Sequence, residues 1–589
     1  MIFGIISLLV SLALPVVLVV VIVRAVSARQ GRVGEGHGVR RFFQYLLLLG
    51  LLVVTLIGVA ELITLAVTPV LADTGGALAR GLTFTLFGGG LLTGVVLWTR
   101  ATMRGDPGER GSTAWAVYLT LAGLVTAIVA AVGLGTLAHG LVRGRPDAGS
   151  AVVVVVWGLA WALHWRLVAR TLDRSREVAL MLVGSLIGWS IGVAGLVTLL
   201  SVTLRLVVPQ PTALVGPSAV TQGLAAGVGL LAAGAWLWLP HWTRRMSTAP
   251  RDPVWLGYVL VVGLGASLVV TLTGASIVAY RVLVWLLGDP GTIGAAAYLA
   301  ATTVPLAMAV VGVLSWWYHR AVLLAGAAPE RTEAARVHEY LLAGIALGAA
   351  ATGVALVVVA LVDAVAPAPR ELVTTSVVNA LLAAVTLLMV GGPLWWWFWR
   401  RIAVARAADP VGEAASPTRR VYLVVLFGVA GVVAVIVVLV GAFVVLDDAI
   451  RGTVSAETLR DARVPLGILL AAGAVSGYHW LIQRADRGVA TPATVRGPSV
   501  VLLVGPRDDA LAREIRRVTG ARVDTWPADG PAWDGPGVLA AVAGVHMPRV
   551  LVLSDAQGLR VVGSGREVGR SDDSAPDADE HGDEPGGGG

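Results

Sequence analysis

The chain has 589 residues, of which 56 % are apolar and 14 % charged, whereas a soluble chain usually carries about a quarter charged residues. It contains no Cys, which excludes disulfides and thiolate chemistry, and its 44 basic residues are all Arg, which excludes lysine-dependent catalysis. The net charge of +7 does not indicate nucleic-acid binding, because the arginines fall in short clusters between apolar runs. This composition is typical of a multi-pass membrane protein.

Thirteen apolar segments are long enough to cross a hydrocarbon core of about 30 Å as helices. The predicted fold is therefore mainly α, a polytopic transmembrane bundle of about 13 helices with a small cytoplasmic α/β domain. The expected spans are 2–23, 42–67, 82–99, 114–139, 151–168, 177–204, 217–240, 254–279, 294–318, 337–362, 372–399, 421–446 and 464–482.

The distribution of arginine predicts the orientation of these spans. Five arginines follow the first apolar segment and none precedes it, so we interpret that segment as a retained helix with its N-terminus outside. The loops on one side then carry 26 arginines and those on the other side 9. Because basic loops stay in the cytoplasm, the C-terminus is predicted to be cytoplasmic. The exclusive use of Arg favours a bacterial source, and hence the bacterial plasma membrane.

After the first helix the sequence repeats with a period near 80 residues, and each unit is a predicted helix pair. Most first helices open with aromatic residues, as in Trp115-Ala116-Val117-Tyr118, and most second helices end in a Trp/His cluster, as in Trp238-Leu239-Pro240-His241-Trp242. The expected organisation is an N-terminal helix with a basic loop (1–37), six repeat units (38–112, 113–176, 177–252, 253–335, 336–418 and 419–495), a cytoplasmic α/β domain (496–566) and a disordered acidic, Gly-rich tail (567–589).

The repeated doublet of aromatic helix start and Trp/His helix end resembles the bacterial multi-pass membrane family called domain of unknown function 5671. The resemblance covers roughly residues 38–487 and is strongest in units two, three, four and six. Units one and five depart from the pattern, since unit one lacks the histidine and unit five carries Phe398 in its place. The resemblance implies membrane-embedded helix pairs and no assigned activity.

From about residue 498 the pattern changes to that of a small soluble domain. Strands are expected at 499–504, 522–526, 549–553 and 559–562, and helices at 508–519 and 538–543, in the order β-α-β-α-β-β. Gly505-Pro506-Arg507-Asp508 joins a strand to a helix, where an anion could meet free helix N–H groups. An ordinary N-cap at Asp508 or Asp509 explains the same residues.

Histidines at equivalent helix ends are the only candidates for cofactor binding, and haem is the cofactor that they suggest: His164, His241, His319 and His479. No acidic residue recurs beside them, so no metal site, catalytic residue or resident cofactor is expected. The alternative is that they belong to an interfacial belt. Its predicted anchors are Trp161, Trp165, Trp238, Trp242, Trp316, Trp317, Trp395, Trp399 and Trp480.

For transport, an ionisable group at mid-bilayer would be informative, because it is costly to keep there without a function. Glu61 is the one acidic residue well inside a span, and it is expected near the outer boundary. Asn379 is a strongly polar residue inside a span, and it could equally be interhelical glue.

The leading hypothesis is a non-enzymatic membrane scaffold or sensor that displays a cytoplasmic domain, since the repeats show no buried charge and no catalytic constellation. The alternatives are a transporter or channel for a neutral or apolar substrate, and a membrane haem protein. The predicted partners are the lipid bilayer, with anionic headgroups at the inner Arg loops, and a cytoplasmic protein or small ligand at the C-terminal domain.

Overall fold

The structure is a computed structural model. It describes residues 38–68, 74–207, 217–247, 251–292, 294–325, 332–366, 376–487, 498–545, 547, 549–555 and 558–564. Within them, 12 helices are long and apolar enough to cross a membrane, and they correspond to the second through thirteenth expected spans. The expected first span and the acidic tail lie outside the described residues. The predicted helical membrane fold is confirmed.

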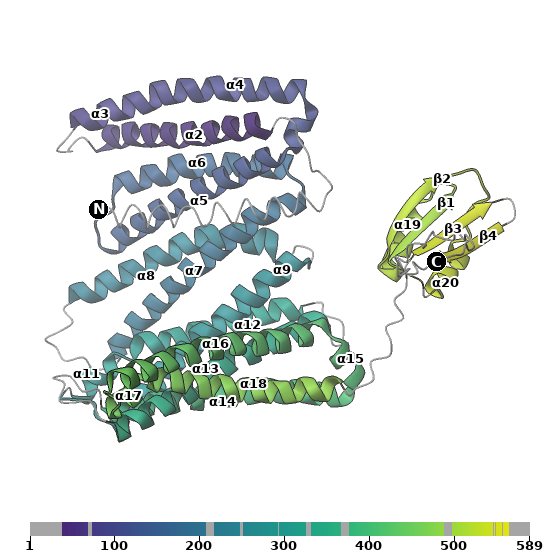
Figure 1. The fold of residues 1–589 in the computed structure, drawn as a ribbon. Helices are drawn as coiled ribbons and strands as arrows, with labels where there is room; N and C mark the ends of the chain where they lie inside the picture. Colours follow the sequence, from purple (N-terminus) through teal and green to yellow (C-terminus); the bar gives the residue numbers. More distant parts are fainter. Residues whose placement is uncertain are drawn as a thin grey trace, which may run out of the picture. The chain divides into compact units, whose positions relative to one another are not determined.

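The bundle consists of long helices, some of them interrupted by short π-helical segments or preceded by short helices at turns (Figure 1). The elements of the first three pairs are α2 (Gly38–Val67), α3 (Thr74–Thr83), η1 (Phe84–Gly88), α4 (Gly89–Gly105), η2 (Pro107–Gly111), α5 (Thr113–Val142), α6 (Ala148–Thr171), α7 (Arg174–Val207), α8 (Pro217–Trp238) and η3 (Leu239–Met246). Those of the last three are α9 (Pro253–Gly257), η4 (Tyr258–Ala266), α10 (Ser267–Leu287), α11 (Ala295–Ala300), α12 (Thr303–Leu324), α13 (Glu333–Val365), α14 (Val377–Ala408), α15 (Pro410–Ala415), α16 (Pro417–Arg451), α17 (Ala456–Asp461) and α18 (Arg463–Arg487).

In the first five pairs, the helices that are neighbours in sequence pack side by side and antiparallel, and successive pairs pack on one another in chain order. In Figure 1 the pairs run from the purple α2 and α4 to the green α13 and α14. The contacts between pairs join α2 to α5 and α6, α5 to α8, α7 to α12, α10 to α14 and α13 to α16. Consecutive pairs therefore share one side-chain core, which joins residues from Tyr45 to Leu423.

Small residues let paired helices approach closely. Close packing matters in a membrane because lipid is as apolar as the side chains, and no hydrophobic force draws the helices together. A Cβ added at Gly195 of α7 would lie 2.6 Å from the backbone nitrogen of Leu231 in α8. One added at Gly391 of α14 would lie 2.8 Å from the backbone nitrogen of Ala350 in α13. These glycines set how tightly the two helices of a pair can pack.

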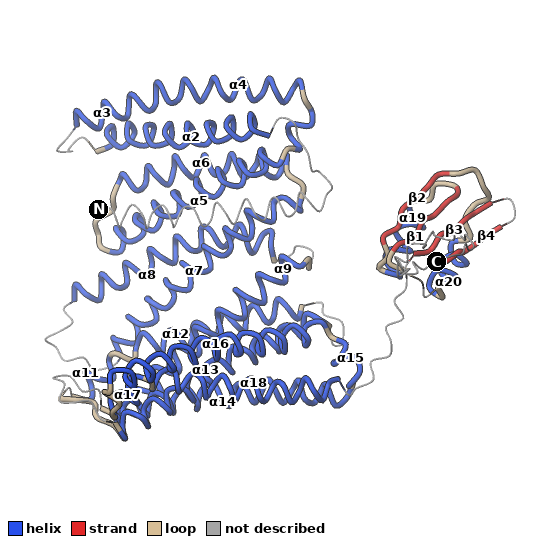
Figure 2. Tube along the Cα trace, viewed as in Figure 1, coloured by secondary structure: helices blue, strands red, loops and turns tan. Residues whose placement is uncertain are grey.

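The C-terminal unit contains all the strands of the described chain (Figure 2). Its elements are β1 (Val500–Gly505), α19 (Asp509–Thr519), β2 (Arg522–Pro527), α20 (Gly535–Ala543), β3 (Arg549–Asp555) and β4 (Gly558–Ser564). The strands form one sheet in the order β2-β1-β3-β4, in which β4 alone is antiparallel. The predicted β-α-β-α-β-β order is confirmed.

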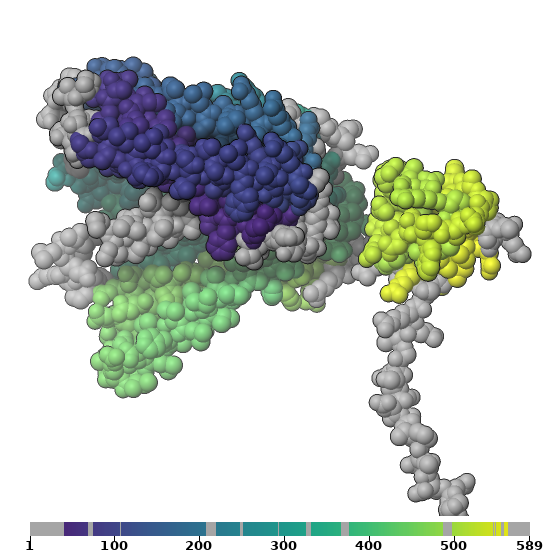
Figure 3. All heavy atoms as spheres, turned by 90° about the horizontal axis from the view of Figure 1, so that it is seen from above, coloured from purple at the N-terminus to yellow at the C-terminus, as the bar shows by residue number. Residues whose placement is uncertain are grey.

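This unit has a core of its own. Val501 and Leu503 of β1 alternate with half-buried residues and pack against Ile515 of α19 and Val542 of α20. The chain divides into two compact units, residues up to Asp486 and from Arg487 onward. Figure 3 shows the described part of the second unit as a compact body in yellow-green.

Candidate functional site

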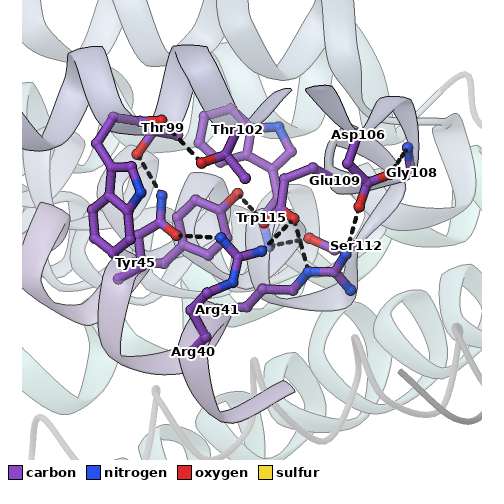
Figure 4. Close-up of polar contacts among 12 residues, drawn as sticks. Arg40, Arg41, Tyr45, Thr99, Thr102, Asp106, Gly108, Glu109, Ser112 and Trp115 are labelled. Carbon is purple, nitrogen blue, oxygen red and sulfur yellow. Dashed lines mark hydrogen bonds and ion pairs between the residues drawn. The ribbon is translucent and has the colours of Figure 1, made fainter. Parts of the chain in front are cut away.

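The first helix pair ends in a buried carboxylate, that of Glu109 in η2, which is 0 % exposed. Arg40 and Arg41 of α2 donate to its Oε2 at 3.0 and 2.9 Å, and the hydroxyl of Tyr45 donates to Oε1 at 3.0 Å (Figure 4). Arg41 and Tyr45 are one helical turn apart and therefore lie on the same face of α2. That face meets the turn that follows α4.

Local sequence builds this turn. The carboxylate of Asp106 accepts a hydrogen bond from the backbone N–H of Gly108 and so caps η2, in which Pro107 takes the first position. Ser112 then caps α5 by accepting a hydrogen bond from the backbone N–H of Trp115 at 3.2 Å. Glu109 thus lies between the two capping residues, and its side chain points back to α2.

The fifth pair repeats the arrangement around Glu413, which is 1 % exposed and lies in α15. Arg336 Nε donates to its Oε1 at 2.8 Å, and Tyr340, again one turn further along the helix, donates to Oε2 at 3.3 Å. Asp409 and Ser416 cap the flanking helices as Asp106 and Ser112 do.

The second cluster also reaches the last helix pair. Arg419, 2 % exposed, donates through Nη1 to the hydroxyl of Tyr340 at 2.7 Å and through Nε to the carboxylate of Asp486 at 2.6 Å. Arg406 forms an ion pair with the same Asp486 at 2.7 Å. Helices α13, α14, α16 and α18 are therefore joined by one charged network at their common end.

These clusters correct the expectation that the helix pairs contain no buried charge. Both oxygens of Glu109, and both of Glu413, are occupied by Arg and Tyr donors. A carboxylate whose oxygens both accept hydrogen bonds from Arg and Tyr is not positioned to exchange protons with a substrate. Loss of a partner would leave a charge buried and uncompensated, which would destabilise the fold. The arrangement is that of a polar brace between helices.

The four candidate histidines share one geometry. In each, Nδ1 lies 2.6–2.8 Å from the carbonyl oxygen four residues earlier: His164 to Ala160, His241 to Leu237, His319 to Ser315 and His479 to Val475. Because a carbonyl only accepts, Nδ1 carries the proton and a neutral ring has its lone pair on Nε2. In His164 that nitrogen lies 3.2 Å from the hydroxyl of Tyr118.

Glycines make room for two of these rings. A Cβ at Gly184 of α7 would lie 2.5 Å from Cδ2 of His241, and a Cβ at Gly263 of η4 would lie 2.5 Å from Cδ2 of His319. The ring neighbours of His241 and His319 include Trp165 at 5.2 Å and Trp242 at 5.6 Å, each contributed by the preceding unit. The histidines therefore pack where consecutive pairs meet.

Tryptophan and tyrosine extend these contacts between units. Trp242 donates to the hydroxyl of Tyr318 at 2.8 Å, and Trp399 donates to the hydroxyl of Tyr478 at 2.6 Å. Trp242 is fully buried, whereas Trp317 is 65 % exposed. The predicted anchors fall into three environments: Trp242 and Trp399 are buried, Trp161, Trp165, Trp238, Trp316 and Trp395 are half-buried, and Trp317 and Trp480 are exposed.

Glu61 and Asn379, the two residues considered for transport, both have bonding partners in the structure. Glu61 of α2 forms an ion pair with Arg80 of α3. Asn379 accepts a hydrogen bond from the backbone N–H of Asp289 at 2.9 Å and donates one to its carbonyl at 2.8 Å. Asn379 thus ties the start of α14 to the end of α10. Within the part of the chain that the structure describes, no group of three His, Asp or Glu side chains is placed to hold a metal ion.

In the C-terminal unit, Asp508 is the N-cap of α19 and accepts hydrogen bonds from the backbone N–H groups of Ala510 and Leu511, both at 2.9 Å. Trp533 covers the end of β1 and donates to the carbonyl of Pro506 at 2.5 Å. The cap accounts for the Gly505-Pro506-Arg507-Asp508 segment, and anion binding there stays a prediction.

Residues 41–149 and 336–474 match the model of the family described as domain of unknown function (DUF5671). Neither the curated proteins nor the solved structures include a significant match. The resemblance to this family is confirmed, and the protein is a multi-pass membrane protein with a small C-terminal sheet. A match in two separate regions is consistent with a repeated chain, and the six-unit period stays a prediction.

The two matched regions cover only part of the repeat units. The matched regions contain units one and five, which lack the Trp/His ending, and they leave out units three and four, which have it. What the two regions share in the structure is the Arg–Glu–Tyr brace at Glu109 and Glu413. In the sequence, the brace is an Arg-x-x-x-Tyr segment near the start of the first helix of a pair. After the second helix come Asp-Pro and then a Glu, which stands three residues before the Ser that caps the next helix. We interpreted those arginines only as topology signals and therefore missed it.

Proposed function

We propose that the protein is a non-enzymatic scaffold of the bacterial plasma membrane, which displays its C-terminal α/β unit in the cytoplasm. The observation that carries this proposal is the separate hydrophobic core of that unit, in which Val501, Ile515 and Val552 are each 0 % exposed. A unit with its own core does not need the bundle for burial of apolar surface.

The buried polar groups of the bundle support the same proposal. The carboxylates of Glu109, Glu413 and Asp486 are engaged by arginines of neighbouring helices, and the histidine Nδ1 atoms face backbone carbonyls. These interactions hold helices together and leave their charged groups paired. The bundle is built for rigidity, which suits a membrane platform.

Cleavage between the two units tests this proposal. A specific protease site inserted between Arg487 and Pro498 is cut in inverted and in right-side-out membrane vesicles. We expect cleavage in inverted vesicles only, release of a soluble fragment that melts cooperatively, and an unchanged melting temperature of the remaining bundle. An uncut chain with the same insertion is the control for the effect of the added residues.

Two results would contradict the scaffold. Cleavage from the opposite side would place the domain outside the cytoplasm. A bundle that loses stability when the domain leaves would show that the domain is part of the membrane fold and not a displayed module.

One observation favours the second candidate, transport or binding of an apolar molecule. A cavity of about 380 Å³ lies between α7, α8 and α12, lined by Trp189, Leu231 and Val311, with His319 also in its wall. Its walls are almost entirely apolar, so the substrate class would be a neutral, lipid-like molecule. The test is uptake of such a molecule into proteoliposomes. Gly192 lies in the cavity wall, so Gly192→Leu should fill the cavity. Uptake by the wild type that is lost in this variant would favour transport over the scaffold.

A further inference from the structure

A second cavity, of about 590 Å³, lies where the third helix pair meets the start of the fourth. It is enclosed by the first turns of α7, the end of η3 and the start of α9. Val178, Met181, Met246 and Trp255 form its apolar wall, and Met246 and Trp255 are almost fully buried. This cavity belongs to neither of the two Arg–Glu–Tyr clusters and lies outside the matched family regions.

Three arginines line the cavity: Arg174, Arg244 and Arg245. Arg245 is paired, because its Nη1 lies 3.7 Å from Oε2 of the buried Glu177. Arg174 and Arg244 are exposed, and among the described residues neither forms a hydrogen bond or an ion pair within 4 Å, although the charge of Arg174 also acts on Glu177. Two guanidinium groups are thus available for an added anion.

The acidic residues of the cavity are already engaged. Asp252 caps α9 by accepting a hydrogen bond from the backbone N–H of Trp255 at 2.7 Å, and Glu177 faces Arg245. Beside the cavity, Arg251 lies over the ring of Trp255 at 5.5 Å, and the buried Arg176 donates to the carbonyl of Gly111 at 2.6 Å. The cavity carries a surplus of positive charge after these pairs are counted.

The backbone of α7 adds to that charge. Arg174 is the first residue of the 34-residue helix α7, whose N-terminal end carries the positive end of the helix dipole. Arg244 and Arg245 lie on η3, a π-helical segment at the end of the α8 span, and π-bulges recur at functional sites. Both elements direct cationic groups toward one cavity.

We propose that this cavity binds a phosphate group, with Arg174 and Arg244 as its direct ligands and Arg245 held in place by Glu177. Planar guanidinium groups match the oxygens of phosphate in geometry and charge. The adjoining wall of Met and Trp side chains suits the glycerol and first methylenes of a lipid, and helix ends are the depth at which headgroups lie. The source that fits the whole cavity is an anionic phospholipid such as phosphatidylglycerol.

The test compares the full chain with Arg174→Gln/Arg244→Gln. The matched control is Arg166→Gln/Arg170→Gln, which removes two exposed arginines at the end of the adjoining helix α6. Purified proteins are titrated with phosphatidylglycerol, phosphatidylcholine, glycerol phosphate and inorganic phosphate. Bound molecules are counted by native mass spectrometry, and the melting temperature is followed in parallel.

We expect the wild type and the control to bind one phosphatidylglycerol that phosphatidylcholine does not displace, and the cavity variant to bind it about tenfold more weakly. A response to glycerol phosphate or inorganic phosphate equal to that of the lipid would support the phosphate site and assign it a soluble ligand. Equal binding by the cavity variant and the control, at unchanged melting temperatures without ligand, would overturn the proposal.

Discussion

At the scale of single residues, the buried glutamates are charged groups whose partners come from other helices. Glu109 is fully buried and serves three donors, from Arg40, Arg41 and Tyr45. Such a group contributes little net stability over an apolar residue, because burying the charges has already cost their hydration. Removing one partner, in contrast, leaves a buried charge uncompensated.

Glu109→Gln should therefore destabilise the bundle by about 3–5 kcal/mol, since Arg41 is 5 % exposed and would lose its buried counter-charge, keeping the ion pair with the exposed carboxylate of Asp106 at 3.3 Å. Unfolding in a detergent titration, followed by tryptophan fluorescence, measures the change. Glu457→Gln is the control: this carboxylate is 63 % exposed and pairs with Arg460, so its loss should cost less than about 1 kcal/mol. Equal losses in the two variants would contradict the brace.

At the scale of elements, the packing of α7 on η3 depends on the absence of a side chain at Gly184. A Cβ there would overlap the ring of His241, which is fully buried and fixed by its bond to the Leu237 carbonyl. Gly263 serves His319 in the same way in the fourth pair. His241 and His319 therefore each depend on a glycine of the facing helix, which a search for ligands would overlook.

Gly184→Ala should destabilise the bundle by about 1–3 kcal/mol through overpacking against His241. Combining it with His241→Ala should lose less than the sum of the two single changes, because the clash disappears with the ring. Gly192→Ala on the same helix is the control, since a Cβ there meets nothing within 4 Å. Additive losses measured by thermal unfolding in detergent would argue against the contact.

At the scale of the whole molecule, the arginine count predicts how the bundle sits in its membrane. Reporter fusions after Asp147, Asp289 and Asp448 should be active outside the cytoplasm, and fusions after Arg104, Arg245 and Arg406 inside. Activity of alkaline phosphatase and of a fluorescent protein at each position gives the measurement. A reversed pattern at two or more positions would rule out the thirteen-span arrangement.

The sequence by itself determined the membrane class, twelve of the spans and the order of elements in the C-terminal unit. Apolar runs of 20 residues and short alternating strands are local patterns, and local patterns are set by the solvent that each segment must face. The sequence left Asn379 open between a transport role and interhelical glue, and only the structure shows that it bonds to the Asp289 backbone and ties α14 to the end of α10.

Only the tertiary structure decided what the charged helix ends do. Arg41 and Glu109 are 68 residues apart, as Arg336 and Glu413 are 77 apart, and nothing in either segment alone shows that they meet. The same holds for Gly184 and His241, and for Arg174 and Arg244 at one cavity. These contacts depend on how helix pairs stack, because stacking brings together ends that are distant in sequence, and a buried charge is tolerable only where its partner arrives from another element.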